Sequence, residues 1–127
     1  MSSTFDTSAR PLIRIQIEAE PTLEAFQEIF EQVEEELARF TSICVLVDAR
    51  QTKRIDLSQV KRIAEFGERN DELLGAYIRV LAFVIPSAMV RGALKVAFQL
   101  KAPPHPVHIC QTEAQARSYI DPVLDIL

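Results

Sequence analysis

The chain has 127 residues, of which 48% are hydrophobic and 25% are charged, and its formal net charge is −4. This length is typical of one domain, and the balance of apolar and charged residues excludes a largely disordered chain. The acidic balance excludes nucleic acid as the expected partner, because binding phosphates requires a clustered excess of Lys and Arg. We therefore expect one folded domain over residues 12–127, preceded by a flexible leader over residues 1–11.

The sequence predicts neither a membrane span nor a secretory signal. Its longest apolar run, Val80–Ile85, is far shorter than the roughly 20 residues that a spanning helix needs. Met1–Arg10 lacks the apolar centre of a signal peptide. Cys44 and Cys110 each lie inside an apolar strand-like run, which is typical of free thiols in a core. These features predict a cytoplasmic protein.

The first half of the domain alternates between strand and helix patterns. Residues 12–17 alternate β-branched apolar residues with polar ones, which predicts a first strand. Apolar positions over residues 23–40 are spaced three or four apart, which predicts a first helix. The short apolar run Ile43–Val47 predicts a second strand, parallel and covered on both faces.

The second helix has the most complete start signals. Asp56 can cap it, and Gln59 three residues later completes a variant of the capping box. Ile55 and Val60 can form the hydrophobic staple around this start. The helix should end before Gly75, because glycine readily adopts the left-handed conformation that ends many helices.

The second half continues the alternation. Tyr77–Ile85 predicts a central third strand, and Ser87 predicts the cap of a third helix. Residues 107–110 predict a fourth strand, and Thr112 predicts the cap of a fourth helix. Asp121–Pro122 predicts a second helix start, at which the chain changes direction and leaves a short apolar tail.

The third helix has more apolar surface than one sheet face can cover. Besides the stripe that can face the sheet, a second apolar stripe repeats at helical spacing. It consists of Met89, Ala93, Val96 and Leu100. Because monomers rarely expose large apolar patches, we interpret this stripe as the surface of a homodimer, with a hydrophobic ligand as the alternative.

Strands that alternate with helices predict the α/β class, with a four-stranded, mostly parallel sheet in the order βαβαβαβα. The pattern leaves open whether the first strand is parallel or an antiparallel edge. Ligands of open α/β sheets bind beyond the carboxyl ends of the strands, and the loop after the second strand is the most polar candidate.

That loop follows Asp48 and carries three cations just before the second helix: Arg50, Lys53 and Arg54. The free N–H groups at a helix start favour anions, so one hypothesis is an anion-binding site. In the alternative, the cations solvate the loop or pair with nearby glutamates, and Asp56 is only a cap. No glycine lies between Asp48 and Val60, so the loop does not match a P-loop or a dinucleotide-binding fingerprint.

Catalytic and metal-binding signatures are weak. His105, His108 and Cys110 have spacing that permits a metal site, but no second cluster supplies further ligands, so we interpret them as structural. Ser87 follows a strand without the G-x-S-x-G pattern of a nucleophile, and we interpret it as a helix cap. We expect no metal, no cofactor and no enzymatic activity.

Two segments carry a family resemblance. Residues 45–50 read Val-Leu-Val-Asp-Ala-Arg, and residues 114–120 read Ala-Gln-Ala-Arg-Ser-Tyr-Ile. With the order of elements, they resemble the SpoIIAA-like family of small bacterial domains, which is related in fold to STAS domains. The resemblance covers about residues 12–120.

In anti-sigma-factor antagonists of the STAS type, a strand ends in Asp, and a later helix begins with an Ile-Asp-Ser-Ser-Gly-like stretch bearing a phosphorylated serine. Residues 55–59 of this chain read Ile-Asp-Leu-Ser-Gln. Asp56 and Ser58 match the Asp and the second Ser, whereas Leu57 replaces the first Ser and Gln59 the Gly. The resemblance implies candidate regulatory residues at Asp48, Asp56 and Ser58, with Ser58 as the phosphorylation site.

The resemblance implies a noncatalytic regulatory domain that binds a protein partner. We expect it to form a homodimer through the third helix and the C-terminal tail. The alternative is a carrier of a lipid-like or anionic small molecule, because other members of the group resemble SEC14-type lipid-binding domains. Such a carrier would hold its ligand at the strand ends with Arg50, Lys53 and Arg54.

Overall fold

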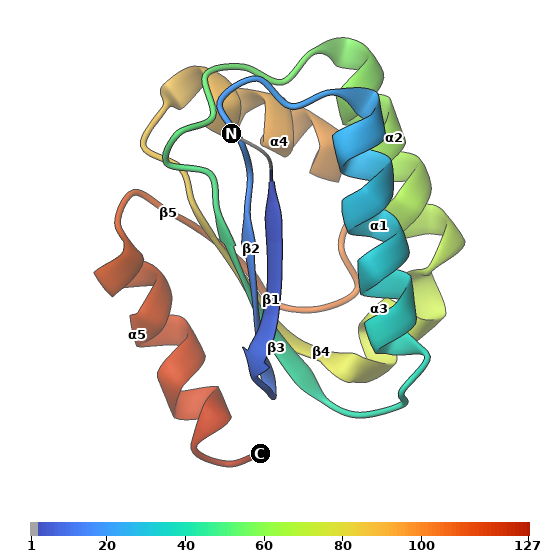
Figure 1. Ribbon diagram of the computed structural model, residues 1–127, viewed down its shortest axis with the longest axis vertical. Coiled ribbons are helices and arrows are strands. Elements are labelled where there is room, and N and C mark those ends of the chain that lie inside the picture. The colour runs from blue at the N-terminus through green and yellow to red at the C-terminus, as the bar shows by residue number, and fades with distance from the viewer. Residues whose placement is uncertain (1–2) are drawn as a thin grey trace.

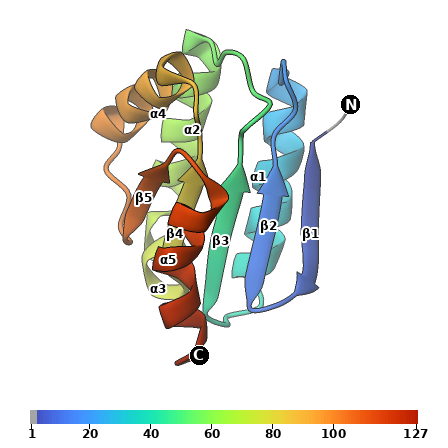
Figure 2. The ribbon, with the colours of Figure 1, turned by 90° about the vertical axis from the view of Figure 1, so that its left-hand side faces the viewer.

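A five-stranded sheet forms the centre of the protein and carries helices on both faces (Figure 1). The computed structural model describes residues 3–127. The strands are β1 (Thr4–Ala9), β2 (Leu12–Gln16), β3 (Ile43–Asp48), β4 (Ile78–Val84) and β5 (Val107–Cys110). The helices are α1 (Leu23–Leu37), α2 (Leu57–Arg69), α3 (Asp71–Tyr77), α4 (Ala88–Leu100) and α5 (Glu113–Leu124). Helices α1 to α4 lie on one face of the sheet, and α5 alone covers the other (Figures 1 and 2).

The strands stand in the sheet in the order in which they occur in the chain, β1-β2-β3-β4-β5. β2 pairs parallel with β3, with Ile13 opposite Val45, so the first predicted strand is a parallel one. β4 and β5 are parallel to it as well, and only β1 is antiparallel. The predicted α/β class and mostly parallel sheet are confirmed, with five strands in place of four.

The fifth strand, β1, lies in the predicted flexible leader, and this part of the prediction was wrong. Residues 4–9 pair antiparallel with β2, with Phe5 opposite Ile15. Phe5 packs against the core, while its neighbours along the strand are polar or small. One large apolar side chain in six residues gives little periodic signal. Backbone pairing with β2 holds this edge strand in place. Residues 1 and 2 of the leader lie outside the described part of the chain.

The predicted second helix is two helices. α2 ends at Arg69, Asn70 lies between, and α3 follows at once. Gly75 is a helical residue of α3, and none of the glycines in the described part has a positive φ, so Gly75 does not terminate a helix in the left-handed conformation. A Cβ at this position would lie 3.3 Å from Cβ of Pro104, which is tighter than most contacts. The glycine therefore allows the segment before β5 to pass close to α3.

The predicted second start at residues 121–122 was also wrong, because α5 continues through Pro122 to Leu124. The backbone N–H of Asp125 donates to the Asp121 carbonyl at 3.1 Å, so the helical pattern continues past the proline. Proline removes only one hydrogen bond in this last turn. The apolar tail divides: Val123 and Leu124 pack against the core, whereas Ile126 is 83% exposed.

The sheet separates two apolar cores. The core under α5 contains small side chains, including Cys44 and Cys110, which are free and buried, as predicted. Burial raises the pKa of the Cys44 thiol to about 11. The core under α1 to α4 contains large aromatic rings, with Phe30 stacked on Phe66 at 4.4 Å between ring centroids. None of the helices in residues 3–127 has the length and apolar character to span a membrane.

Candidate functional site

Four charged side chains form a cluster at the carboxyl end of β3. Asp48, the last residue of β3, is only 4% exposed. Arg50 donates to both carboxylate oxygens of Asp48, from Nε at 3.0 Å and from Nη2 at 2.7 Å. Arg14, from β2, reaches the same carboxylate at 3.3 Å and donates to Glu113 of α5 at 2.6 Å. The cluster therefore joins two strands, the loop after β3 and the start of α5.

The charges in this cluster balance. Burial alone would raise the pKa of Asp48, but the hydrogen bonds and charge of Arg50, with the charge of Arg14, outweigh it and lower that pKa. The hydrogen bond from Arg14 likewise lowers the pKa of Glu113. Two cations thus face two carboxylates. Arg50 is engaged with Asp48 and Glu113, and the anion-binding site of Arg50, Lys53 and Arg54 stays a prediction.

The start of α2 has the predicted capping box. Asp56 Oδ1 accepts from the Gln59 backbone N–H at 3.0 Å, and Gln59 Oε1 accepts from the Asp56 backbone N–H at 3.0 Å. Gln59 is buried, and its side-chain amide also donates to the Pro21 carbonyl. In the preceding loop, Lys53 donates its backbone N–H to the Ala19 carbonyl at 2.9 Å. These bonds hold the start of α2 against the segment that leads into α1.

Ser58 lies exposed in the first turn of α2, and its hydroxyl donates to Asp56 Oδ1 at 2.6 Å. This hydrogen bond, with the cap bond from Gln59, lowers the pKa of Asp56. Lys53 and Arg54 are exposed in the same loop. In residues 3–127, no hydrogen bond or ion pair joins Asp48 to Asp56 or Ser58, so the predicted regulatory residues divide into a buried part and an exposed part.

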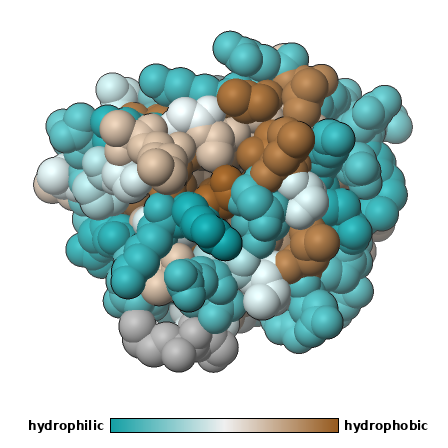
Figure 3. All heavy atoms as spheres, turned by 90° about the horizontal axis from the view of Figure 1, so that it is seen from above, coloured by the Kyte–Doolittle hydropathy of each residue, from teal (hydrophilic) through white to brown (hydrophobic). Residues whose placement is uncertain are grey.

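The second apolar stripe of α4 is uncovered in the single chain. Met89 is 72% exposed and Leu100 is 59% exposed, with Val96 also exposed and Ala93 half-buried. Leu57, at the start of α2, is 62% exposed as well. Seen from above, apolar side chains form an irregular band on this end of the molecule, between polar ones (Figure 3). These side chains are available for contact with another molecule.

The two histidines have separate surroundings, and His108 shares its side of the sheet with Cys110. The ring of His108 stacks on Tyr119 of α5, with centroids 3.7 Å apart and planes inclined by 6°. Cys110 is buried under α5, whereas His105 lies before β5 and faces the opposite core. Within residues 3–127, no group of three or more His, Cys, Asp or Glu side chains is arranged to hold a metal ion.

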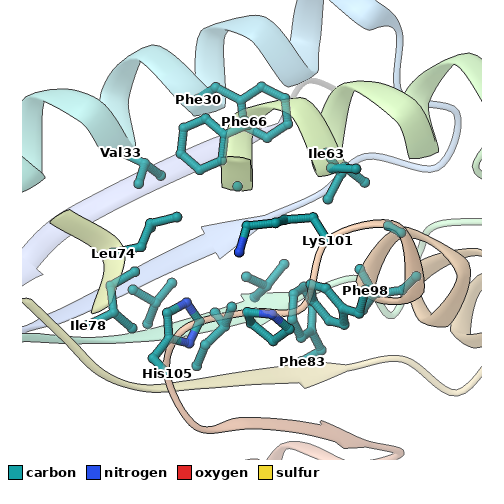
Figure 4. A pocket seen from close by; sticks show the side chains of 18 of the residues that line it. Phe30, Val33, Ile63, Phe66, Leu74, Ile78, Phe83, Phe98, Lys101 and His105 are labelled. Atoms are coloured by element: carbon teal, nitrogen blue, oxygen red, sulfur yellow. The ribbon is translucent and has the colours of Figure 1, made fainter. Parts of the chain in front are cut away.

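The structure also contains a cavity of about 150 Å³ between the sheet and α1 to α4 (Figure 4). Five of the chain's seven phenylalanines line it: Phe26, Phe30, Phe66, Phe83 and Phe98. Among the described residues that line it, only Lys101 and His105 have polar side chains. No pattern in the sequence predicted this cavity, because a void arises from how four helices and a sheet pack together. The only sequence signal is the number of phenylalanines on elements predicted to face one core.

The cavity opens toward α2 and the segment after α4. Its lining residues on α1, β2 and β3 are all buried, whereas Ile63 and Gly67 of α2 are partly exposed. Lys101 is partly exposed too, and Ala102 and Pro104 are exposed. The two polar side chains therefore lie near the opening. Arg50, Lys53 and Arg54, with which the alternative hypothesis held a ligand at the strand ends, do not line this cavity.

No known protein family matches the sequence, and no curated protein matches it significantly. Two solved structures are similar. One is a protein of the DUF3478 family with a SpoIIAA-like fold from Shewanella loihica PV-4, with a TM-score of 0.65, 15% identity, and coverage of 93% of this chain and 91% of that chain. The other is the anti-sigma factor antagonist SpoIIAA in its unphosphorylated form, with a TM-score of 0.65, 17% identity, and coverage of 99% of each chain. The chain therefore has a SpoIIAA-like fold, as the resemblance implied.

Proposed function

We propose that the protein is a noncatalytic regulatory domain, which binds another protein through the surface around the start of α2. The observation that carries this proposal is the exposed Ser58 hydroxyl, hydrogen-bonded to Asp56 on a firmly held helix start. The similarity in fold to an anti-sigma factor antagonist supports a role of this type.

The start of α2 combines rigidity with exposure. The capping box and the bond from Gln59 to the Pro21 carbonyl fix the backbone. A partner that binds here therefore does not need to order a flexible segment, which lowers the entropic cost of binding. Leu57 is 62% exposed and supplies an apolar contact, and Lys53 and Arg54 supply a polar rim. A rigid backbone, an apolar centre and a charged rim are features of protein-binding surfaces.

Phosphorylation of Ser58 would change this surface through local electrostatics. A phosphate adds a charge of about −1.5 to −2 at neutral pH. It would remove the hydroxyl that donates to Asp56, only 2.6 Å away, and repel that carboxylate. Lys53 and Arg54 are the nearby cations that could pair with the phosphate. Phosphorylation would therefore give the same surface two electrostatic states without a change of fold.

The first test is mass spectrometry of the protein recovered from its host. We expect phosphate on Ser58 and its loss in Ser58→Ala. Ser118→Ala is the matched control, because Ser118 is also an exposed helical serine, on α5. The absence of phosphate from Ser58 under every growth condition would contradict regulation by phosphorylation of this residue.

The second test is affinity capture from host lysate with quantitative mass spectrometry. We expect one protein to be captured by the wild type and by Ser118→Asp, and to be lost with Ser58→Asp and Leu57→Asp. Equal capture of that protein by all four forms would place the binding surface elsewhere and contradict the proposal.

Self-association through the second stripe of α4 is part of the proposal. Val96 is 42% exposed, and burial of such side chains against a second copy would remove apolar surface from water. In sedimentation velocity at micromolar concentration we expect a dimer, which Val96→Glu converts to a monomer. Lys95→Glu, at the neighbouring exposed position, should leave the dimer intact. A monomeric wild type would contradict this part.

A further inference from the structure

The cavity under α1 to α4 has a polar end built by Lys101. The Lys101 Nζ donates to Asp71 Oδ1 at 2.5 Å and to the Ala102 carbonyl at 2.9 Å. In Figure 4 the Lys101 side chain extends across the space between Ile63 and Leu74. An ammonium group has three N–H donors, and these bonds use two. One donor remains for a molecule inside the cavity.

His105 supplies the complementary group. Its Nδ1 lies 3.3 Å from the Pro106 carbonyl oxygen, which can only accept, so Nδ1 carries the proton. Burial lowers the pKa of His105, and the ring is therefore neutral at pH 7. In a neutral ring protonated at Nδ1, Nε2 is an acceptor. The polar end of the cavity thus offers one donor and one acceptor.

The rest of the cavity suits a compact apolar group. A cavity of about 150 Å³ lined by aliphatic and aromatic side chains is large enough for benzene. The lining includes Phe83 and Phe98, whose rings are tilted with centroids 6.0 Å apart. An aromatic or short alkyl body would fill this space against ring faces and edges.

We propose that the cavity binds a small neutral molecule with an apolar body about the size of a benzene ring and a single hydroxyl group, that is, an alcohol or a phenol. The hydroxyl oxygen accepts from Lys101, and the hydroxyl hydrogen donates to Nε2 of His105. A carboxylate fits less well, because it has no hydrogen for His105 and because Asp71 already neutralises Lys101. This site uses residues 63–67 of α2 and not the helix start, so it goes beyond the proposed regulatory surface.

The test is an NMR titration of the full chain with benzyl alcohol and, separately, with benzoate, which has the same ring but a charged end group. We expect benzyl alcohol to cause saturable shifts confined to residues that line the cavity. Benzoate should bind at least tenfold more weakly. Shifts that do not saturate, shifts scattered over the surface, or equal or tighter binding of benzoate would each overturn the proposal.

Two variants fill the cavity from α2, and either one keeps the test decisive if the other fails to fold. Ala64→Phe places a ring in the space, and Gly67→Met extends a flexible side chain toward it; a Cβ at Gly67 contacts only Cγ of Lys101, at 3.4 Å. We expect at least a tenfold loss of benzyl alcohol affinity in a folded variant. Unchanged affinity in a folded variant overturns the site.

A matched pair of variants distinguishes the hydrogen-bond donor of Lys101 from its ion pair with Asp71. Lys101→Met removes the donor and should weaken benzyl alcohol at least fivefold. Asp71→Asn removes the negative partner but leaves the Lys101 amine, and should bind within twofold of the wild type. If Lys101→Met binds as tightly as the wild type, the assigned orientation of the hydroxyl is wrong and the proposal falls.

Discussion

The two faces of the sheet are covered in opposite ways. One helix, α5, covers one face; the residues of the buried core beneath it are at most 7% exposed, and the hollow on this face lies at its edge, between β5 and α5. Four helices cover the other face (Figure 2). An apolar cavity of about 150 Å³ nevertheless lies within the core beneath them. The difference lies in side-chain size. Ala82 and Ala116, both 0% exposed, place small side chains between α5 and the sheet, whereas on the other face the large rings that line the cavity do not fill the space between the helices and the sheet.

Close packing therefore depends on how side chains of different size interdigitate, and not on how many helices cover a face. It predicts that the same substitution has different consequences on the two faces. Three experiments test this difference, and they begin with the largest expected effect.

Truncating a buried side chain should reduce the free energy of unfolding most under α5. Ile120 is 0% exposed, and Ile120→Ala removes buried methyl groups from a tightly packed layer, so we expect a loss of about 2–5 kcal/mol in the free energy of unfolding. Ile63, partly exposed beside the cavity, is the matched position on α2, and Ile63→Ala should cost about 1 kcal/mol. Urea denaturation measures both. Equal losses would mean that the two faces do not differ in packing.

Enlarging a buried side chain should destabilise the protein on the α5 face but not on the face with the cavity. Ala116→Leu forces three carbon atoms into a filled layer and should destabilise the protein by about 1–3 kcal/mol. Ala64→Leu directs the same atoms toward the cavity and should leave the stability unchanged or raise it by up to about 1 kcal/mol. Thermal denaturation by circular dichroism detects both shifts. Destabilisation by Ala64→Leu comparable to that of Ala116→Leu would argue against a cavity that can be filled.

Acid should loosen the attachment of α5 before the rest of the protein. The folded-state pKa values of Asp48 and Glu113 are lowered. Their contribution to the free energy of unfolding is therefore complete above the unfolded-state pKa values, near pH 4, and is lost as the pH falls through the lower folded-state pKa values. Asp48→Asn should cost about 1 kcal/mol at pH 7, because it removes the negative charge and one of the two acceptor oxygens that face Arg50 and Arg14.

The measurement is the free energy of unfolding between pH 7 and pH 3. The wild type should lose stability below about pH 4, and Asp48→Asn should show a flatter decline. Glu28→Gln, at an exposed position on α1, serves as the control and should follow the wild type. A decline of the same steepness in Asp48→Asn would show that the cluster does not contribute to acid sensitivity.

Local signals in the sequence were sufficient for most of the fold. Asp56 and Gln59 predicted the start of α2 because a capping box is made by side chains three residues apart, and the structure has both bonds. The sequence did not predict β1, because a strand held mainly by backbone pairing needs no apolar alternation. It also assigned the wrong role to Gly75, whose reason is the approach of Pro104, 29 residues later in the chain.

The candidate sites show the same limit. The sequence placed Asp48 and Arg50 at a strand end, and it identified Ser58 and the exposed stripe of α4. It did not predict that Arg14 and Glu113 would close a neutral cluster around Asp48, because those residues are 99 positions apart. The cavity with Lys101 and His105 was missed for the same reason, since its walls come from seven helices and strands and from two connecting segments. Tertiary packing alone brings such groups together.

The order of the strands has a consequence for how the protein is made. Each strand pairs with the one synthesised just before it, so the sheet can grow on the ribosome without waiting for a later strand to insert between earlier ones. The helices over one face emerge between these strands, whereas α5 emerges after β5. Until then, the apolar face that contains Leu46, Val80 and Val84 has no cover. The nascent chain is therefore most vulnerable to aggregation between the emergence of β5 and that of α5, which covers this face.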